Sequence, residues 1–446
     1  MRIPVLVVVP SQTSLVESAL EAATGQPPSV PVGAALPAGV EPDPEFTAVP
    51  LGTGRPETTV LESLQPQASE SFVLRGFVEA DSQTEVPEES DGRPMFADPQ
   101  IAPFLTCGGS PPLGNAATVQ AKLRVSQLAA KRLDGAGVAV AIMDTGINLA
   151  HLTAKLGRIP AFDVTNSWTP AGVTNLPGRH PVDHGTMCAF DALLAAPAAT
   201  LLDYPILAGR APGGAVVGRT ISVALLGYAQ LIAGWAVAFA PGGAARYGAL
   251  VVSNSWGIYH PSWDFPPGHR GRFCDNPRHP FNVLAATLAA SGADILFAAG
   301  NCGSQCADMR CQGRVTGAIM GTNALPDVLT LAGCDTADLR VGYSSQGPSI
   351  AGMFPQKPDV TTYTHFLGSE AFGTGSPDSG TSASCPVAAG CVAAIRTRMS
   401  PQNLPPANLF DQLRLTARPA AGQLGWNGDY GHGLLDPLAA AQSLGL

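Results

Sequence analysis

The stretch GVAVAIMDTGIN, residues 137–148, runs from an apolar segment into an aspartate and a glycine-containing turn. The segment before the aspartate carries no polar side chain, which is typical of a strand that is covered on both faces. Asp144 stands where this predicted strand ends. A carboxylate there either caps a turn or serves as a functional acid at the carboxyl end of the strand. By itself, the stretch favours the cap.

Apolar runs of the same kind recur along the chain, and alanine-rich segments lie between or after them. Such alternation predicts an α/β fold with a mostly parallel central sheet and helices on both faces. Functional side chains gather at the carboxyl ends of the strands in such sheets. The further predicted strands are ALVVSNSWG (249–257), DILFAAGN (294–301) and DVLTLAGC (327–334), and the predicted helices are AFDALLAA (189–196), NVLAATLAAS (282–291) and PVAAGCVAAIRTRM (386–399).

Two motifs place reactive side chains at the starts of predicted helices. His184, in VDHGTMCAFDALLAA (182–196), falls in the first turn of one helix, where a single histidine is usually structural. Ser382, in SGTSASCP (379–386), opens another apolar helix and has small neighbours. Small neighbours leave room for a substrate, and a helix N-terminus favours developing negative charge.

Together, Asp144, His184 and Ser382 can divide the work of acyl transfer. Serine becomes a nucleophile when a histidine takes its proton, and a carboxylate orients that histidine. Asn301, at the end of FAAGN (297–301), supplies an amide for the oxyanion. An asparagine there also fits a simple turn. Because all four residues occur in one chain, the sequence favours the catalytic interpretation.

These motifs, in their order along the chain, resemble the motif series of the subtilisin-like serine peptidases. The resemblance covers about residues 117–446 and includes the closing segment YGHGLLDPLAAAQ (430–442). The other stretches that carry it are VAIMDTGIN (140–148), DHGTMCA (183–189), SNSWG (253–257), AAGN (298–301), SSQGPS (344–349), KPDV (357–360) and GTSASCPVAAG (380–390).

The resemblance implies that Asp144, His184 and Ser382 form a catalytic triad and that Asn301 is the oxyanion-hole side chain. It also implies two segments that flank the substrate backbone and wall the first specificity pocket, so that a bound peptide is added as a strand. These segments are Ser255, Trp256, Gly257 and Ala298, Ala299, Gly300.

The motif sequences GTSASCP (380–386), with Ala383 after the serine, and HGTMCA (184–189) are closer to those of kexin-like convertases. The acidic clusters that give convertases their dibasic preference are not found in this sequence, so that preference is not implied. Calcium sites are frequent in the family, but no ligand set matches one here. The sequence therefore predicts no metal and no cofactor.

The leading hypothesis is a serine endopeptidase that cleaves protein or peptide substrates through an acyl-enzyme on Ser382. One alternative is a peptide ligase or macrocyclase of a peptide-maturation pathway, in which an amine replaces water. A further alternative is a catalytically silent peptide-binding protein. The presence of all four catalytic positions argues against the silent protein.

Residues 1–114 differ from residues 115–446 in their sequence pattern. We expect a domain boundary in the linker CGGSPPLGNAA (107–117). The first region is rich in proline and predicts a small α/β unit with a helix opening near Ser14. Its texture and position resemble the inhibitory prodomains of the family, and MFADPQIAPF (95–104) resembles the strand that leads from such a prodomain to the active site. An accessory domain is the alternative. The other predicted elements are IPVLVVV (3–9), SLVESALEAA (14–23), FTAVPL (46–51), SFVLRGFVEA (71–80) and PMFADPQI (94–101).

Composition excludes several classes of function. A chain of 446 residues with 45% apolar and 13% charged residues is long and apolar enough to fold into a compact core. Its net charge of −9 comes without a basic stripe, which argues against nucleic acid as a partner. The apolar stretch 223–240 contains Gln230 and glycines and predicts a buried helix rather than a membrane span. The absence of a signal-peptide pattern favours a cytoplasmic location.

The nine cysteines fall into two groups. Those in small, apolar surroundings are predicted to be buried free thiols. The others lie in polar or glycine-rich stretches and are compatible with disulfides. The cluster NCGSQCADMRC (301–311) is also compatible with a zinc site. The spacing of its cysteines makes a disulfide or a free thiol the better interpretation. The first group is Cys188, Cys385 and Cys391, and the second is Cys107, Cys274, Cys302, Cys306, Cys311 and Cys334.

The segment 258–281 between SNSWG (253–257) and the next helix is too long for a tight loop. It is rich in proline and aromatic residues. A surface loop and a substrate-contacting loop are equally compatible with it.

Overall fold

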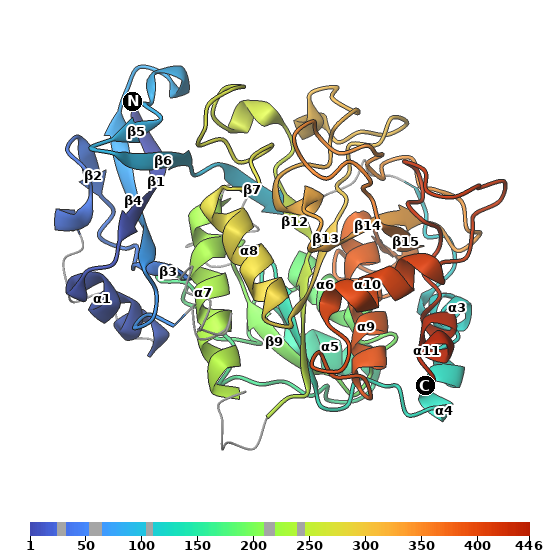
Figure 1. The fold of residues 1–446 in the computed structure, drawn as a ribbon. Helices are drawn as coiled ribbons and strands as arrows, with labels where there is room; N and C mark the ends of the chain where they lie inside the picture. Colours follow the sequence, from blue (N-terminus) through green and yellow to red (C-terminus); the bar gives the residue numbers. More distant parts are fainter. Residues whose placement is uncertain (25–32, 53–64, 104–109, 209–218, 239–245) are drawn as a thin grey trace.

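The computed structural model describes residues 1–24, 33–52, 65–103, 110–208, 219–238 and 246–446 (Figure 1). Its largest sheet has the strand order β15-β14-β13-β11-β8-β9, and all neighbouring strands in it are parallel. This arrangement confirms the predicted α/β fold with a parallel central sheet. The strands are β8 (Val138–Met143), β9 (Thr200–Tyr204), β11 (Ala249–Asn254), β13 (Asp294–Ala298), β14 (Leu329–Cys334) and β15 (Val360–Tyr363).

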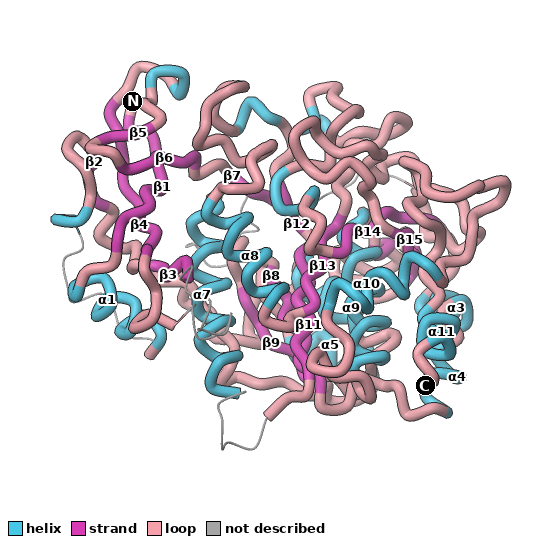
Figure 2. Tube along the Cα trace, viewed as in Figure 1, coloured by secondary structure: helices cyan, strands magenta, loops and turns pink. Residues whose placement is uncertain are grey.

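Helices cover both faces of this sheet, as Figure 2 shows. Alternate residues of β8 belong to different cores: Val140 and Ile142 pack with the helices on one face, and Ala139 and Ala141 pack with those on the other. This alternation is the reason why the strand carries no polar side chain. The first face is covered by α6 (His184–Ala192) and α9 (Thr381–Arg396), and the second by α7 (Ile221–Ala238) and α8 (Pro280–Ala290).

Helices α6 and α9 pack unusually closely at Gly390. A Cβ atom on Gly390 would lie 2.2 Å from the carbonyl oxygen of Ala192, at the end of α6. Because α6 begins with His184 and α9 carries Ser382, this contact sets the spacing of the two helices that bear the reactive side chains.

We expect Gly390→Ala to lower the free energy of unfolding by about 1–3 kcal/mol, because a backbone atom must move to admit the methyl group. The gain in helix propensity of about 1 kcal/mol does not offset this cost. Denaturant unfolding measures the change. Gly248→Ala is the matched control, because its added Cβ meets no atom nearer than 3.7 Å. Equal stability of the two variants would contradict the close helix contact.

The N-terminal region forms an antiparallel sheet of its own with the order β2-β4-β1-β6-β5, and β3 also pairs with β4. Its central strand β1 pairs along its whole length with β4. This agrees with the predicted small α/β unit. Its elements are β1 (Arg2–Pro10), α1 (Thr13–Ala23), β2 (Val40–Pro42), β3 (Val49–Gly52), β4 (Ser71–Glu79), β5 (Glu89–Ser90), β6 (Arg93–Ala97) and β7 (Gln100–Pro103).

Helix α1 begins at Thr13, next to the predicted start near Ser14, and the side chain of its N-cap Gln12 makes no capping hydrogen bond. One local prediction in this region was wrong. The stretch 94–101 forms parts of two strands instead of one. Asp98 separates them because it accepts hydrogen bonds from the Arg75 side chain and from the backbone of Ser222.

Strand β7 follows β6 and extends from the N-terminal sheet to β12, as Figure 1 shows. It belongs to a small sheet with the order β10-β7-β12. Its neighbours belong to the second part of the chain, so the two regions share a sheet. The remaining elements are β10 (Arg219–Thr220), β12 (Trp256–Gly257), β16 (Phe366–Leu367), β17 (Pro377–Asp378), α3 (Ala116–Lys122), α4 (Val125–Ala130), α5 (Leu149–Leu156), α10 (Pro406–Leu415) and α11 (Pro437–Ser443).

The apolar stretch from residue 223 lies in α7, which packs against α1 and α8. Gln230 on this helix donates a hydrogen bond to the carbonyl of Ala22 at 2.6 Å. None of the helices in the described residues is long and apolar enough to cross a membrane.

Cysteines 188, 385 and 391 are buried free thiols, as predicted, and so are Cys274 and Cys334. Cys302 forms a disulfide with Cys311, and Cys306 is also disulfide-bonded. The thiols of the 301–311 cluster are therefore not metal ligands. Cys107 lies outside the described residues.

Candidate active site

Asp144 and His184 meet at the carboxyl edge of the main sheet. Asp144 follows the last residue of β8, and His184 is the first residue of α6. The Nδ1 atom of His184 lies 2.8 Å from Oδ1 of Asp144, and both side chains are almost fully buried. The same carboxylate oxygen accepts a hydrogen bond from the Thr145 backbone at 2.7 Å. An aspartate in this position fixes the Nδ1–H tautomer, which makes Nε2 the basic nitrogen.

Ser382 is the second residue of α9, and it exchanges two hydrogen bonds with Ser255. The Ser382 hydroxyl donates to the carbonyl of Ser255 at 3.2 Å, and the Ser255 hydroxyl donates to the carbonyl of Ser382 at 3.0 Å. The Ser382 carbonyl also accepts a weak bond from the Cys188 thiol at 3.5 Å. The residue four positions later is Pro386, which has no N–H to donate to this carbonyl. The proline thus leaves it available to the neighbouring segments.

Asn301 has an orientation that other hydrogen bonds determine. Its Oδ1 atom accepts from the backbone N–H and the hydroxyl of Thr381, at 2.9 and 3.1 Å. The Thr381 hydroxyl in turn accepts from the backbone of Gly300 at 3.0 Å. With the oxygen held in this way, Nδ2 is the donor end of the amide, next to α9. An oxyanion site requires such a fixed donor.

The main chain around Trp256 pairs with β7, while the Trp256 side chain lies in the interior. The indole packs against the rings of Phe281 and Phe297 and is fully buried. Trp256 and Gly257 pair antiparallel with Pro103 and Ala102 of β7. Ala298 is the last residue of β13, and Ala299 and Gly300 connect that strand to Asn301.

The segments at Trp256 and at Ala298 are joined by Asn323, which sequence analysis missed. Its Nδ2 atom donates to the carbonyl of Trp256 at 3.1 Å and to the carbonyl of Ala298 at 2.9 Å. No sequence signal indicates this role, because Asn323 lies in a short 3-10 turn, Gly321–Ala324, where asparagine is an ordinary residue. The strand β10, which pairs with the other edge of β7, was also missed, because its two residues are too few to show a strand pattern.

Comparisons with known proteins identify the family of this chain. The sequence profile of the subtilase family matches residues 135–433. The chain belongs to the subtilase family. Its matched residues therefore form a subtilisin-like serine protease domain.

Two curated relatives of this subtilase, from Trichormus variabilis and Nostoc sp., are each named calcium-dependent protease. Each is 29% identical over 318 residues, which cover 63% of this chain. The chain spans 42% of the length of these relatives. Among solved structures, fervidolysin from Fervidobacterium pennivorans, a keratinolytic enzyme related to subtilisin, aligns with 99% of this chain and 61% of its own. The TM-score is 0.58 at 16% identity, so this likeness shows the fold.

In this subtilase, Cys188 lies beside the aspartate and histidine pair. Its sulfur is 3.7 Å from Oδ2 of Asp144 and 3.8 Å from Nδ1 of His184. Among the described residues these three form the one group whose ligand atoms lie close enough together to hold a metal ion. Burial, with the Asp144 charge nearby, raises the pKa of the Cys188 thiol well above its ordinary value. A protonated thiol is a poor metal ligand and a poor nucleophile.

Two further buried carboxyl groups lie near the subtilase site, one on α6 and one on β17. Asp191 lies on α6 and Asp378 shortly before Ser382, and both are buried. Burial raises the pKa of Asp378 to about 6, and burial together with Asp378 raises that of Asp191 well above its ordinary value. Like charges cannot both remain in a dry site, so one of the two carboxyls is protonated.

The long segment 258–281 contacts the N-terminal region of the subtilase. The His279 ring donates to the carbonyl of Ala97 at 2.8 Å, and burial lowers the pKa of His279 to about 4, so the ring is neutral. The backbone of Ala97 donates to the carbonyl of Gly271 at 2.8 Å. Tyr259, at the start of the segment, donates to the carbonyl of Pro103 at 3.0 Å. The described part of this segment thus packs against β6 and β7 of the same chain.

Proposed function

We propose that this chain is a serine endopeptidase that hydrolyses peptide bonds through an acyl-enzyme on Ser382. The observation that carries the proposal is the pairing of β7 with β12, next to the nucleophile. Gly257 pairs with Ala102 and Trp256 with Pro103, so a chain that continues in this register next passes Ser255. The carbonyl of Ser255 is 3.2 Å from the Ser382 hydroxyl oxygen. A peptide bound in the same way therefore brings its next residue to the nucleophile.

In the proposed reaction, Nε2 of His184 takes the proton of the Ser382 hydroxyl as Oγ attacks the peptide carbonyl. The buried Asp144 stabilises the imidazolium that forms. Nδ2 of Asn301 donates to the oxyanion of the tetrahedral intermediate. The imidazolium then protonates the leaving amine, the C–N bond breaks, and an ester on Ser382 remains. Water, activated by His184, hydrolyses this ester and restores the serine.

We further propose that residues 1–103 inhibit the same site within the chain. Strand β7 fills the place of a substrate between β10 and β12, and Ile101 and Ala102 are almost fully buried there. The N-terminal sheet holds this strand through the contacts of Asp98, whose carboxylate also accepts from the backbone of Ser222 at 2.8 Å. A substrate cannot enter until β7 leaves the cleft.

A fluorophosphonate probe tests the proposed nucleophile. Once the chain has been cut after β7 and the N-terminal region removed, we expect one label per molecule on Ser382, found by mass spectrometry of the labelled peptide. His184→Ala should lose the label, because the hydroxyl then has no base. Ser384→Ala is the matched control on the same helix: its buried hydroxyl bonds Thr362 and Ala332, and it should still be labelled. Labelling at another residue, or no labelling, would overturn the assignment.

A further inference from the structure

A tyrosine of the long segment 258–281 contacts the strand that fills the cleft. Tyr259 is fully buried, and its ring packs near the ring of Trp263, with a centroid distance of 5.8 Å. Its hydroxyl donates to the carbonyl of Pro103 at 3.0 Å. Pro103 is the residue of β7 that pairs with Trp256. The bond therefore reaches the backbone of the bound strand from a segment outside the two flanking edges.

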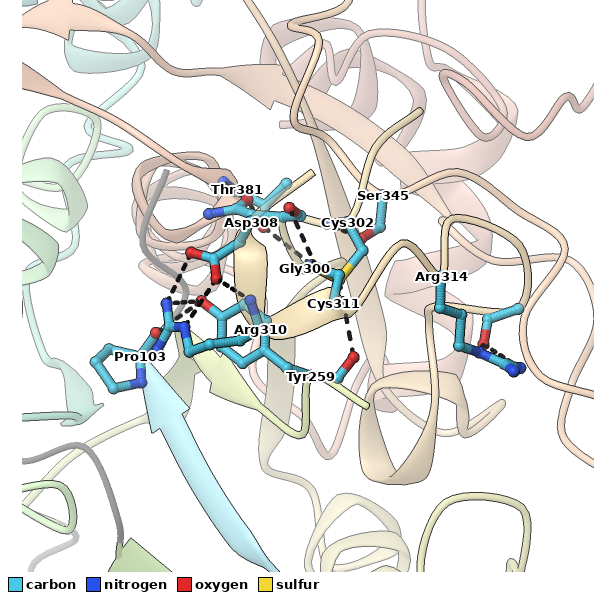
Figure 3. The surroundings of a disulfide bond; sticks show 12 residues. Pro103, Tyr259, Gly300, Cys302, Asp308, Arg310, Cys311, Arg314, Ser345 and Thr381 are labelled. Atoms are coloured by element: carbon cyan, nitrogen blue, oxygen red, sulfur yellow. Dashed lines mark hydrogen bonds and ion pairs between the residues drawn. A yellow bond between two sulfur atoms is a disulfide. The ribbon is translucent and has the colours of Figure 1, made fainter. Parts of the chain in front are cut away.

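Arg310 determines which way this hydroxyl points. Its Nη2 atom donates to the Tyr259 oxygen, and its guanidinium carbon lies 3.8 Å from the centre of the tyrosine ring (Figure 3). Arginine can only donate, so the tyrosine oxygen must accept from it. The single hydroxyl proton is then left for the carbonyl of Pro103. A donor already polarised by a cation also makes a stronger hydrogen bond.

Arg310 is in turn fixed to the loop that follows the oxyanion residue. Nε and Nη2 of Arg310 donate to the two carboxylate oxygens of Asp308, at 2.9 and 3.0 Å. The Asp308 backbone donates to the carbonyl of Asn301 at 3.0 Å. The disulfide between Cys302 and Cys311 closes this loop around Asp308 and Arg310, as Figure 3 shows. The position of the tyrosine hydroxyl is thus set from the same loop as the position of the oxyanion amide.

We propose that Tyr259, oriented by Arg310, is a substrate-binding residue that donates a hydrogen bond to the main-chain carbonyl of the bound residue opposite Trp256. This inference rests on the proposed function, because it treats β7 as a stand-in for a substrate strand. A main-chain carbonyl is present in every peptide, so the contact holds a polypeptide without selecting its side chains. Tyr259 touches the substrate, whereas Arg310 is a positioning residue.

The first experiment requires no activity and uses the full chain with Ser382→Ala. Hydrogen exchange of the peptide that contains β7 is followed by mass spectrometry. Tyr259→Phe keeps the ring beneath Arg310 but removes the donor, and we expect exchange in β7 to become about tenfold faster, the effect of one lost hydrogen bond. Tyr247→Phe is the matched control. Tyr247 lies just before β11, at the amino end of that strand, and its hydroxyl donates a hydrogen bond to Asp163. Equal protection of β7 in both variants overturns the contact.

The second experiment measures hydrolysis by the processed enzyme. A contact made equally in the ground state and the transition state changes KM and leaves kcat alone. Tyr259→Phe should raise KM for peptide substrates about tenfold, whatever their side chains, with active sites counted by the fluorophosphonate label. An amino-acid ester with a free α-amino group has no carbonyl at this position, so its kinetics should not change. An equal loss for the ester and the peptides overturns the proposal.

A double variant tests the role of Arg310. Arg310→Gln should raise KM less than Tyr259→Phe does, and should add nothing to it, because Arg310 acts through the tyrosine hydroxyl. Full additivity would show that Arg310 acts by another route.

If the wild type cleaves no peptide while exchange in β7 still responds to Tyr259→Phe, the proposed function fails and the contact stands. If peptides are cleaved and neither measurement responds, the proposed function stands and this inference fails.

Discussion

Ser382→Ala is expected to lower kcat for peptide hydrolysis by about 10⁶-fold, because the acyl-enzyme cannot form without the hydroxyl. The other members of the site cannot compensate, since His184 and Asp144 then act on no nucleophile. The same change should leave the chain at full length, whereas the wild type should be cut between β7 and α3, in the linker 106–117. Peptide hydrolysis and intact mass measure the two effects.

Ser384→Ala controls for damage to α9, because it removes another buried serine hydroxyl two residues along the helix. We expect this variant to be cut and to hydrolyse peptides like the wild type. Peptide hydrolysis by Ser382→Ala at more than a trace of the wild-type rate would contradict the assignment of the nucleophile. A wild type that is active but never cut would leave the peptidase intact and contradict self-processing.

Residues 1–103, added as a separate piece, are expected to inhibit the processed enzyme, and Ile101→Asp in that piece should weaken the inhibition by about 10³-fold. Ile101 is fully buried on binding and belongs to the same core as Ile221 and Trp256. A carboxylate there is buried without a partner, which costs several kcal/mol. Because β7 lies beyond the N-terminal sheet, the change does not alter the core of the piece itself. The inhibition constant against a peptide substrate measures the effect.

Gln100→Glu is the matched control, because Gln100 is the preceding residue of β7 and is exposed. It introduces the same charge without burying it, so we expect a change of less than about threefold. If both variants inhibit like the unchanged piece, β7 does not occupy the cleft during inhibition. If the unchanged piece does not inhibit at all, an accessory role for residues 1–103 is the better account.

Much of the fold follows from local pattern. Continuous apolar runs such as that before Asp144 predicted strands covered on both faces, and the parallel sheet with two helical layers confirms them. Such an apolar run indicates by itself that both faces of the strand are covered, because a polar side chain on either face would be buried without a partner. The α/β class therefore needed no knowledge of which strand lies beside which. The break between β6 and β7 was less predictable, because Asp98 ends β6 through partners far along the chain.

The proposed reactive residues could also be predicted from the sequence, because each stands in a recognisable local pattern. Asp144 ends a strand, while His184 and Ser382 begin helices, and small residues surround the serine. Each position can be recognised from its own neighbours, and the order of the motifs adds the resemblance to a family. The structure places Asp144 and His184 in hydrogen-bond contact, although 40 residues separate them.

What the sequence determined by itself is thus the class of fold, the family, and a set of residues that each stand at the end of an element. Only the tertiary structure decided which of them share a contact. Strand β7 lies between β10 and β12, Asn323 joins the segments at Trp256 and Ala298, and the hydroxyl of Tyr259 is directed by Arg310. The bonds of Tyr259 span 156 and 51 residues of chain. No local pattern encodes such bonds, because a tyrosine, an asparagine or an arginine in a loop acquires its partner only when the folded sheet and its loops bring distant segments together.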